Sequence, residues 1–253
     1  MINTLRAEFI KLRTILAHWV LAIIALAFPI VVVALVAIFA DWNFGVDSDE
    51  ISGLIVGLTV VSAMLLGAMS AISLTSDYGH NTIRPTYAAT PNRLRVIGAK
   101  VIVNSVVVTV ITTIAVFVAW FVGSTILSTR DLPISLGDDD VLASLISVIV
   151  LAVSVALFAM GLGLIIRNSP ATVTILLLWP LLIEGLVGLV LSLIGWDNAT
   201  RWMPYNAAIN AAAGTSDDFS TEVLGRPMGL VYFAAVSAGL VVIGAVLDQR
   251  RDA

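Results

Sequence analysis

The chain alternates between long uncharged apolar stretches and short polar intervals. Six stretches contain between them a single formally charged side chain, Glu184, and they comprise residues 14–40, 51–76, 101–129, 141–166, 168–196 and 227–247. A helix needs about 20 apolar residues to cross the hydrocarbon core of a bilayer. Each stretch is at least that long, so the pattern predicts a chain that crosses a membrane six times.

The fold class follows from the length of these runs. Uncharged runs do not suit a transmembrane barrel, whose strands alternate over about ten residues. Lipid offers no partners to free backbone groups, so helices are the remaining spanning architecture. We expect an all-α polytopic membrane protein with a single transmembrane domain over residues 1–253, and spans at about 17–40, 51–74, 98–127, 141–166, 171–195 and 229–247.

Residues 2–16 have a different pattern. Apolar side chains recur at three- and four-residue steps, at Ile2, Leu5, Phe9, Leu12 and Leu16. The charged side chains lie off that stripe, at Arg6, Glu8, Lys11 and Arg13. This periodicity predicts an amphipathic helix at the membrane interface, with its cations toward the lipid headgroups. A straight cytoplasmic extension of the first span is the alternative.

Composition agrees with a membrane protein. The chain is 59% hydrophobic and 12% charged, with a mean hydropathy of +1.04, whereas soluble domains carry about 25% charged residues. There is no cysteine, and the two histidines, His18 and His80, lie in different segments, so we expect no metal site. The longest polar interval, roughly 196–228, is too short for a nucleotide-hydrolysing domain.

Basic residues define an orientation. Ten of the thirteen lysines and arginines fall before the first span, in the even-numbered connections or after the sixth span. The positive-inside rule therefore predicts that both termini lie in the cytoplasm.

Two spans contain unusual residues. Gly53, Gly57 and Gly67 put small residues on one face of span two, where they favour close helix packing within or between subunits. Glu184 follows Pro180 in span five. An ionisable group at that depth is expensive and suggests a substrate path or proton relay. A hydrogen-bonded carboxyl in a helix contact is the alternative.

The external loop 196–228 contains aromatic and apolar residues, typical of short re-entrant helices or of a structured loop.

The cytoplasmic loop 75–97, between spans two and three, carries the most specific pattern. It is polar, yet it includes Tyr78, Ile83 and Tyr87 for packing, and turn formers such as Pro91. It is interpreted as a compact helical elbow that docks on a partner, or as a headgroup-facing loop whose cations serve only topology.

Here the chain resembles the permease subunit of ABC type-2 transporters. In that family, the loop between spans two and three typically runs from an acidic residue through Gly-Thr-apolar-basic to Pro-x-Ser-Arg and a later lysine. The matching residues are Asp77, Thr82, Ile83, Arg84, Pro91, Arg93 and Lys100, while Asn81 and Asn92 replace the glycine and the serine. The start Glu8-Phe9-Ile10-Lys11-Leu12-Arg13 is similar to the family's Glu-apolar-apolar-Lys-Leu-Arg.

The resemblance implies a function. In that family the loop is a coupling helix that rests on a separate ATPase subunit. In this chain, the resemblance implies that the coupling residues are Asp77, Tyr78, Thr82, Ile83, Arg84, Pro91 and Arg93. The chain has no G-x-x-x-x-G-K-[ST] loop. ATP and magnesium would therefore be bound by two copies of that subunit, and this chain would be no enzyme and hold no cofactor. A second permease chain, identical or paralogous, would complete a path for an amphipathic drug, peptide or lipid-like substrate. The location implied is the bacterial cell membrane, with lipid as a partner and no nucleic acid.

Two alternatives remain open from sequence. An ion-coupled carrier usually has discontinuous helices in matching halves and several intramembrane polar groups, of which Glu184 is one. A membrane immunity or structural protein without transport has no catalytic signature to look for. An intramembrane protease, in contrast, needs a set of polar side chains that the spans do not supply.

Overall fold

The computed structural model describes residues 1–39, 48–90, 92–132, 135–137, 141–196, 201–214 and 224–250. Regular structure in these residues is helical. Its elements, in order, are α1 (Ile2–Thr14), α2 (Leu16–Phe39), α3 (Ser48–Gly79), α4 (Ile83–Ala89), α5 (Arg93–Ser128), α6 (Val141–Ile166), α7 (Ser169–Leu178), the π-helical turn η1 (Trp179–Ile183), α8 (Glu184–Leu193), α9 (Pro204–Ala213) and α10 (Arg226–Arg250).

Within these described ranges, six helices are long and apolar enough to cross a membrane, counting α7, η1 and α8 as one. This confirms the expected all-helical fold with six membrane-length segments. The structure changes their bounds: α3 continues to Gly79 and α5 already begins at Arg93. The loop 75–97 therefore consists largely of helix, and the connections on either side of α4 are only a few residues long.

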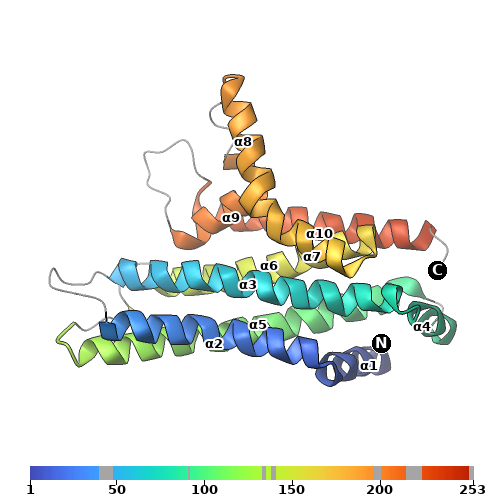
Figure 1. Ribbon diagram of the computed structural model, residues 1–253, viewed down its shortest axis with the longest axis horizontal. Helices are drawn as coiled ribbons and strands as arrows, with labels where there is room; N and C mark the ends of the chain where they lie inside the picture. The colour runs from blue at the N-terminus through green and yellow to red at the C-terminus, as the bar shows by residue number, and fades with distance from the viewer. Residues whose placement is uncertain are drawn as a thin grey trace.

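The bundle is built around α6, which packs most extensively on α3 and α10. The helices α2, α3, α5, α6 and α10 run side by side (Figure 1). Glycines bring α6 and α10 together. A Cβ atom on Gly161 would lie 2.7 Å from Cβ of Leu240, and one on Gly244 would lie 2.5 Å from Cβ of Leu164. Such close approach of backbones is how helices associate without a hydrophobic driving force.

The expected fifth span is not straight. The chain leaves the bundle at η1, and α8 rises steeply away from the other helices (Figure 1). Pro180 has no N–H to donate to the preceding turn. The amide of Glu184 bonds the carbonyl of Trp179, five residues back, in place of the usual bond to the residue four positions back. A proline and a π-type turn are recognised causes of sharp helix kinks. The apolar run 168–196, with Glu184 as its one charged side chain, thus indicated an apolar segment correctly, but not its bend.

A short helix, α9, lies in the interval predicted to hold re-entrant helices. It packs against α10 and α6. Its buried side chains include Tyr205, which meets Phe158 and Phe233 edge-on or tilted at ring-centroid distances of 5.4 and 4.7 Å. Residues 197–200 and 215–223 of this interval lie outside the described residues.

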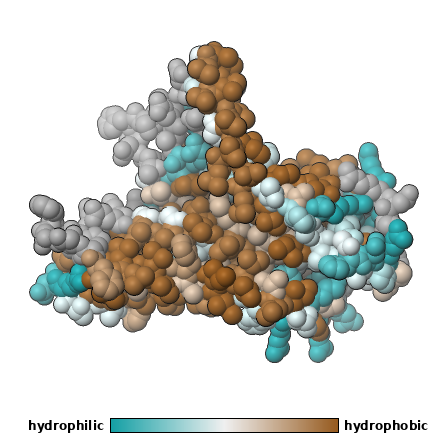
Figure 2. Space-filling view, viewed as in Figure 1, coloured by the Kyte–Doolittle hydropathy of each residue, from teal (hydrophilic) through white to brown (hydrophobic). Residues whose placement is uncertain are grey.

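Apolar and hydrophilic residues are distributed over the surface as a bilayer requires (Figure 2). Figure 2 shows apolar residues over the middle of the bundle and over α8, and hydrophilic residues gathered at the end that carries α1 and α4. Large apolar side chains of α8 are exposed, among them Leu186, Leu189, Val190 and Leu193. Because water would penalise this surface, lipid or another protein must cover it.

Candidate functional site

The candidate site is the elbow formed by the end of α3, the helix α4 and the start of α5. The chain turns at Asn81, whose φ of 56° lies in the left-handed region. Asparagine tolerates that conformation better than most residues, and glycine adopts it freely. This explains how Asn81 serves where the resembled loops carry glycine. At the other side of α4, the Asn92 side chain accepts a bond from the Arg95 amide and starts α5.

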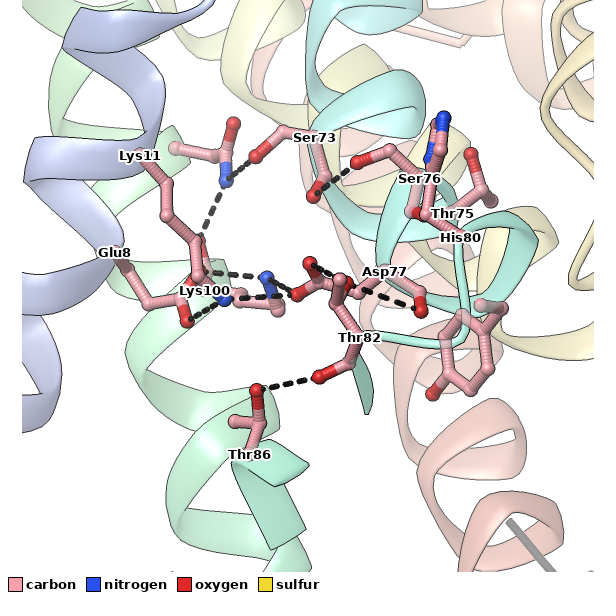
Figure 3. A network of polar contacts seen from close by, with 12 residues as sticks. Glu8, Lys11, Ser73, Thr75, Ser76, Asp77, His80, Thr82, Thr86 and Lys100 are labelled. Atoms are coloured by element: carbon pink, nitrogen blue, oxygen red, sulfur yellow. Dashed lines mark hydrogen bonds and ion pairs between the residues drawn. The ribbon is translucent and has the colours of Figure 1, made fainter. Parts of the chain in front are cut away.

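Four charged side chains meet on one side of the elbow, and we call them the lysine cluster: Glu8, Lys11, Asp77 and Lys100 (Figure 3). Lys100 Nζ lies 2.6 Å from Glu8 Oε2 and 2.6 Å from Asp77 Oδ2. Lys11 Nζ lies 3.1 Å from Glu8 Oε1 and 3.0 Å from Asp77 Oδ2. Thr82 adds a hydrogen bond to Asp77 Oδ1 of 2.9 Å. The cluster therefore joins α1, α3 and α5 to the first residue before α4.

Burial makes the balance of these charges important. Lys100, Glu8 and Asp77 are 2%, 4% and 7% exposed. An unpaired charge at such depth is costly, but two acids and two bases compensate one another. Burial lowers the pKa of Lys11, but the Glu8 and Asp77 carboxylates outweigh this and raise it above its ordinary value. Lys11 thus remains charged throughout the physiological pH range.

A second network, the Asp248 cluster, holds the other side of the elbow. Asp248 on α10 is fully buried and lies 2.6 Å from the Arg167 guanidinium. The hydroxyls of Tyr78 and Tyr87 each donate to its carboxylate at 2.7 Å, and Arg93 donates to its backbone carbonyl at 2.9 Å. Burial, followed by contact with this carboxylate, raises the pKa of Tyr87. The phenol therefore stays protonated and keeps donating.

The helix α4 has an inner and an outer side. Ile83 and Tyr87 are buried and pack with Val96. Arg84, Pro85 and Ala89 are exposed. The outer side faces a groove of about 430 Å³ between α1 and α4, which is lined by Asn3, Thr4, Ala7, Glu8, Lys11, Pro85, Thr86, Ala89 and Thr90. The surface offered to a partner is thus shared between the two short helices.

The residues predicted for this site divide into three groups. Asp77, Tyr78, Thr82, Ile83 and Arg93 all contribute to the packing or bonding that holds the elbow, whereas Arg84 is exposed on it. Pro91 lies outside the described residues.

The interfacial helix was predicted to turn its cations toward lipid headgroups. Phe9 and Arg13 are exposed, as expected for that position. Glu8 and Lys11, however, point inward to the lysine cluster, where they meet Asp77 and Lys100. The opposite charges on α3 and α5 explain this difference.

From the sequence, Tyr87 was expected only to pack and Arg167 only to set the orientation, and Asp248 was given no role; the structure brings the three together. Asp248 lies 161 and 170 residues from the tyrosines that it bonds. The available signal was its place next to the end of an uncharged run. An acidic residue there, on the side rich in basic residues, stands out, but its partners are set by the fold.

Glu184 has an identified structural role. Its carboxylate accepts hydrogen bonds from the backbone amides of Tyr205 at 2.8 Å and Asn206 at 2.9 Å, and from Trp179 Nε1 at 3.1 Å. Those amides lie in the first turn of α9, whose cap residue Met203 has no side chain able to satisfy them. The first amides of a helix need acceptors and favour negative charge. Glu184 therefore caps α9 from the other side of the bend.

The three glycines predicted on span two do not share one environment. Gly67 faces Val155 and Leu176, where a Cβ atom would lie 3.0 and 3.2 Å from their methyl groups. Gly53 and Gly57 are exposed, and nothing lies within 4 Å of a Cβ atom built on either. Packing inside the chain explains Gly67, while Gly53 and Gly57 leave open space along the N-terminal half of α3.

Across the described parts of the chain, no group of three or more histidine, aspartate or glutamate side chains is arranged to hold a metal ion. Comparison with known proteins finds no matching family model, no matching curated protein and no matching solved structure.

Proposed function

We propose that the chain is the permease subunit of an ATP-driven exporter, and that a separate ATP-binding subunit docks on the elbow. Two permease chains and two ATP-binding subunits would form the working assembly in a bacterial cell membrane. The observation that carries the proposal is the architecture of the elbow. The helix α4 presents an exposed side beside a groove, and Tyr87 on its buried side bonds Asp248 of α10. Thr82, immediately before α4, bonds Asp77 in the lysine cluster, which joins α1, α3 and α5.

These networks provide a route for mechanical coupling. A shift of α4 would strain bonds that end on α1, α3 and α5 through the lysine cluster, and on α10 through Asp248. Closely packed elements respond to such a shift by moving together, because interiors are as dense as crystals. ATP binding to a docked subunit would then favour one arrangement of the helices over another.

Glu184 does not favour the ion-coupled alternative. Both carboxylate oxygens already accept bonds from α9 or from Trp179. A carrier that bound its coupling ion at Glu184 would have to release the start of α9 in each cycle. Under the proposal, the substrate is amphipathic and its path runs between the two permease chains.

The test uses the side of α4 that is free to meet a partner. Ile83 is unsuitable, because its removal would disturb the packing with Val96 rather than a docking surface. Ala89→Arg introduces a long cation into the groove from an exposed position. Thr129→Arg is the matched control, since Thr129 is exposed at the opposite end of α5.

Each variant is co-expressed with a tagged ATP-binding-cassette subunit, and co-purification and ATPase activity are measured. The proposal expects Ala89→Arg to reduce the recovered complex about tenfold, equivalent to a loss of about 1.4 kcal/mol, and Thr129→Arg to behave as wild type. Equal recovery and equal ATPase stimulation for both variants would contradict docking at the elbow.

A further inference from the structure

A pocket of about 470 Å³ opens between α1 and the bundle, away from the elbow groove. Most of its lining is apolar and comes from four helices, with Phe9 on α1, Ala22 on α2, Met69 on α3 and Val107 on α5. Phe9 is 51% exposed, so the pocket communicates with the surroundings of the bundle. A cavity of this size and lining suits a flexible hydrocarbon chain.

One part of the lining is polar. His18, in the first turn of α2, is 3% exposed and lines the pocket. Neither ring nitrogen makes a hydrogen bond within 3.5 Å. The Leu12 backbone lies close enough to influence the ring, but it can occupy one nitrogen at most. A buried polar group without a partner is costly, and a ligand with a hydrogen-bonding group would remove that cost.

Charge narrows the class of ligand. Arg13 lines the same pocket, is exposed, and forms no ion pair with the described residues. The lysines of the neighbouring cluster are already matched by Glu8 and Asp77, so Arg13 gives the pocket a local positive charge. An anionic group therefore complements the polar part of the pocket.

The pocket also lies at the depth of a lipid headgroup. It sits at the corner between α1 and α2, where the uncharged run of α2 begins. Trp19 lines the pocket, and its Nε1 donates to the Arg13 carbonyl at 2.7 Å, which fixes this corner. Tryptophan favours the interface between hydrocarbon and water. Apolar lining, local positive charge and interfacial depth thus coincide.

We propose that the pocket binds one anionic phospholipid, with its phosphate at Arg13 and His18 and an acyl chain along Met69 and Val107. The bound lipid would hold α1 against the bundle. This site is independent of the proposed transport function, because it requires neither an ATP-binding subunit nor a second chain.

The experiment is native mass spectrometry of the delipidated protein in detergent, titrated with phosphatidylglycerol or with phosphatidylcholine of the same acyl chains. We expect one phosphatidylglycerol to bind at least fivefold more tightly than phosphatidylcholine. Arg13→Gln should weaken binding of phosphatidylglycerol about tenfold, the size of one lost charge-assisted bond. Arg6→Gln, which removes an exposed α1 cation outside the pocket lining, should leave affinity within twofold.

Equal affinity for the two lipids, or equal loss in Arg6→Gln and Arg13→Gln, would overturn the proposal. Glycerol 3-phosphate offers the same anionic chemistry without a chain, and its displacement of the lipid at equal concentration would reject a lipid site in favour of a phosphate site. His18→Leu should also weaken binding. If that variant does not fold, Arg13→Gln, at an exposed position, decides the question alone.

Discussion

In the described residues, buried acids occur at two places, and they are satisfied in different ways. At the elbow, Asp77 and Asp248 meet cations and hydroxyls from several helices far apart in sequence. At the bend of span five, Glu184 meets backbone amides of one short helix. The elbow acids therefore depend on how several long helices are arranged, whereas Glu184 depends on the position of α9 beside the bend.

The largest expected effect comes from Asp248→Asn. Loss of the charge leaves Arg167 without its buried partner, and breaking a buried pair typically costs 3–5 kcal/mol. We expect the melting temperature of the purified protein to fall by roughly 10 °C. Asp131→Asn is the control, because Asp131 is exposed at the other end of the bundle and has a φ of 60° that asparagine tolerates. Equal melting of both variants would contradict the role given to Asp248.

Asp77→Asn should have the next largest effect, about 2 kcal/mol, since Lys11 and Lys100 then share Glu8 alone. Lys11 is partly exposed, so water relieves part of the imbalance. Combining Asp77→Asn with Lys100→Gln restores equal numbers of acids and bases. The double-mutant cycle should give an interaction energy of 1–3 kcal/mol, measured by thermal or denaturant unfolding. Strict additivity would show that the cluster is not coupled.

Glu184→Gln is expected to cost about 1 kcal/mol, the typical value of a helix cap. Glutamine retains an acceptor oxygen but loses the charge that favours the start of α9. Hydrogen exchange of the Tyr205 and Asn206 amides should rise, while the elbow is unchanged. Export should also remain intact, if the proposed function holds. Loss of export with unchanged amide protection would instead assign Glu184 to the substrate path.

The smallest effect is expected on the open face of α3, in its N-terminal half. Gly57→Ala should change stability by no more than about 0.5 kcal/mol, because the added methyl meets open space and alanine favours helix. Gly161→Ala, its buried counterpart, should cost 1–3 kcal/mol, since its Cβ would meet the Leu240 backbone at 2.8 Å. Thermal melting separates the two. A large loss for Gly57→Ala would mean that another chain packs there.

The sequence allowed the membrane-length helices and the elbow to be predicted, because both depend on local pattern. The bend at Pro180 was harder to predict, since a proline in a membrane helix is often tolerated without departure from the bundle. The partners of Asp248 and Glu184 could not be predicted. Apart from the bond from Trp179 to Glu184, their contacts join residues more than twenty positions apart. No periodicity connects a carboxylate to the amides of a helix not yet placed.

The most direct test of the central claim is transport in proteoliposomes that contain this chain with or without an ATP-binding-cassette subunit that co-purifies with it. The account predicts ATP-dependent movement of an amphipathic substrate only when both proteins are present, and its loss in Ala89→Arg. Transport that continues without the ATP-binding subunit, or that Ala89→Arg leaves unchanged, would contradict it.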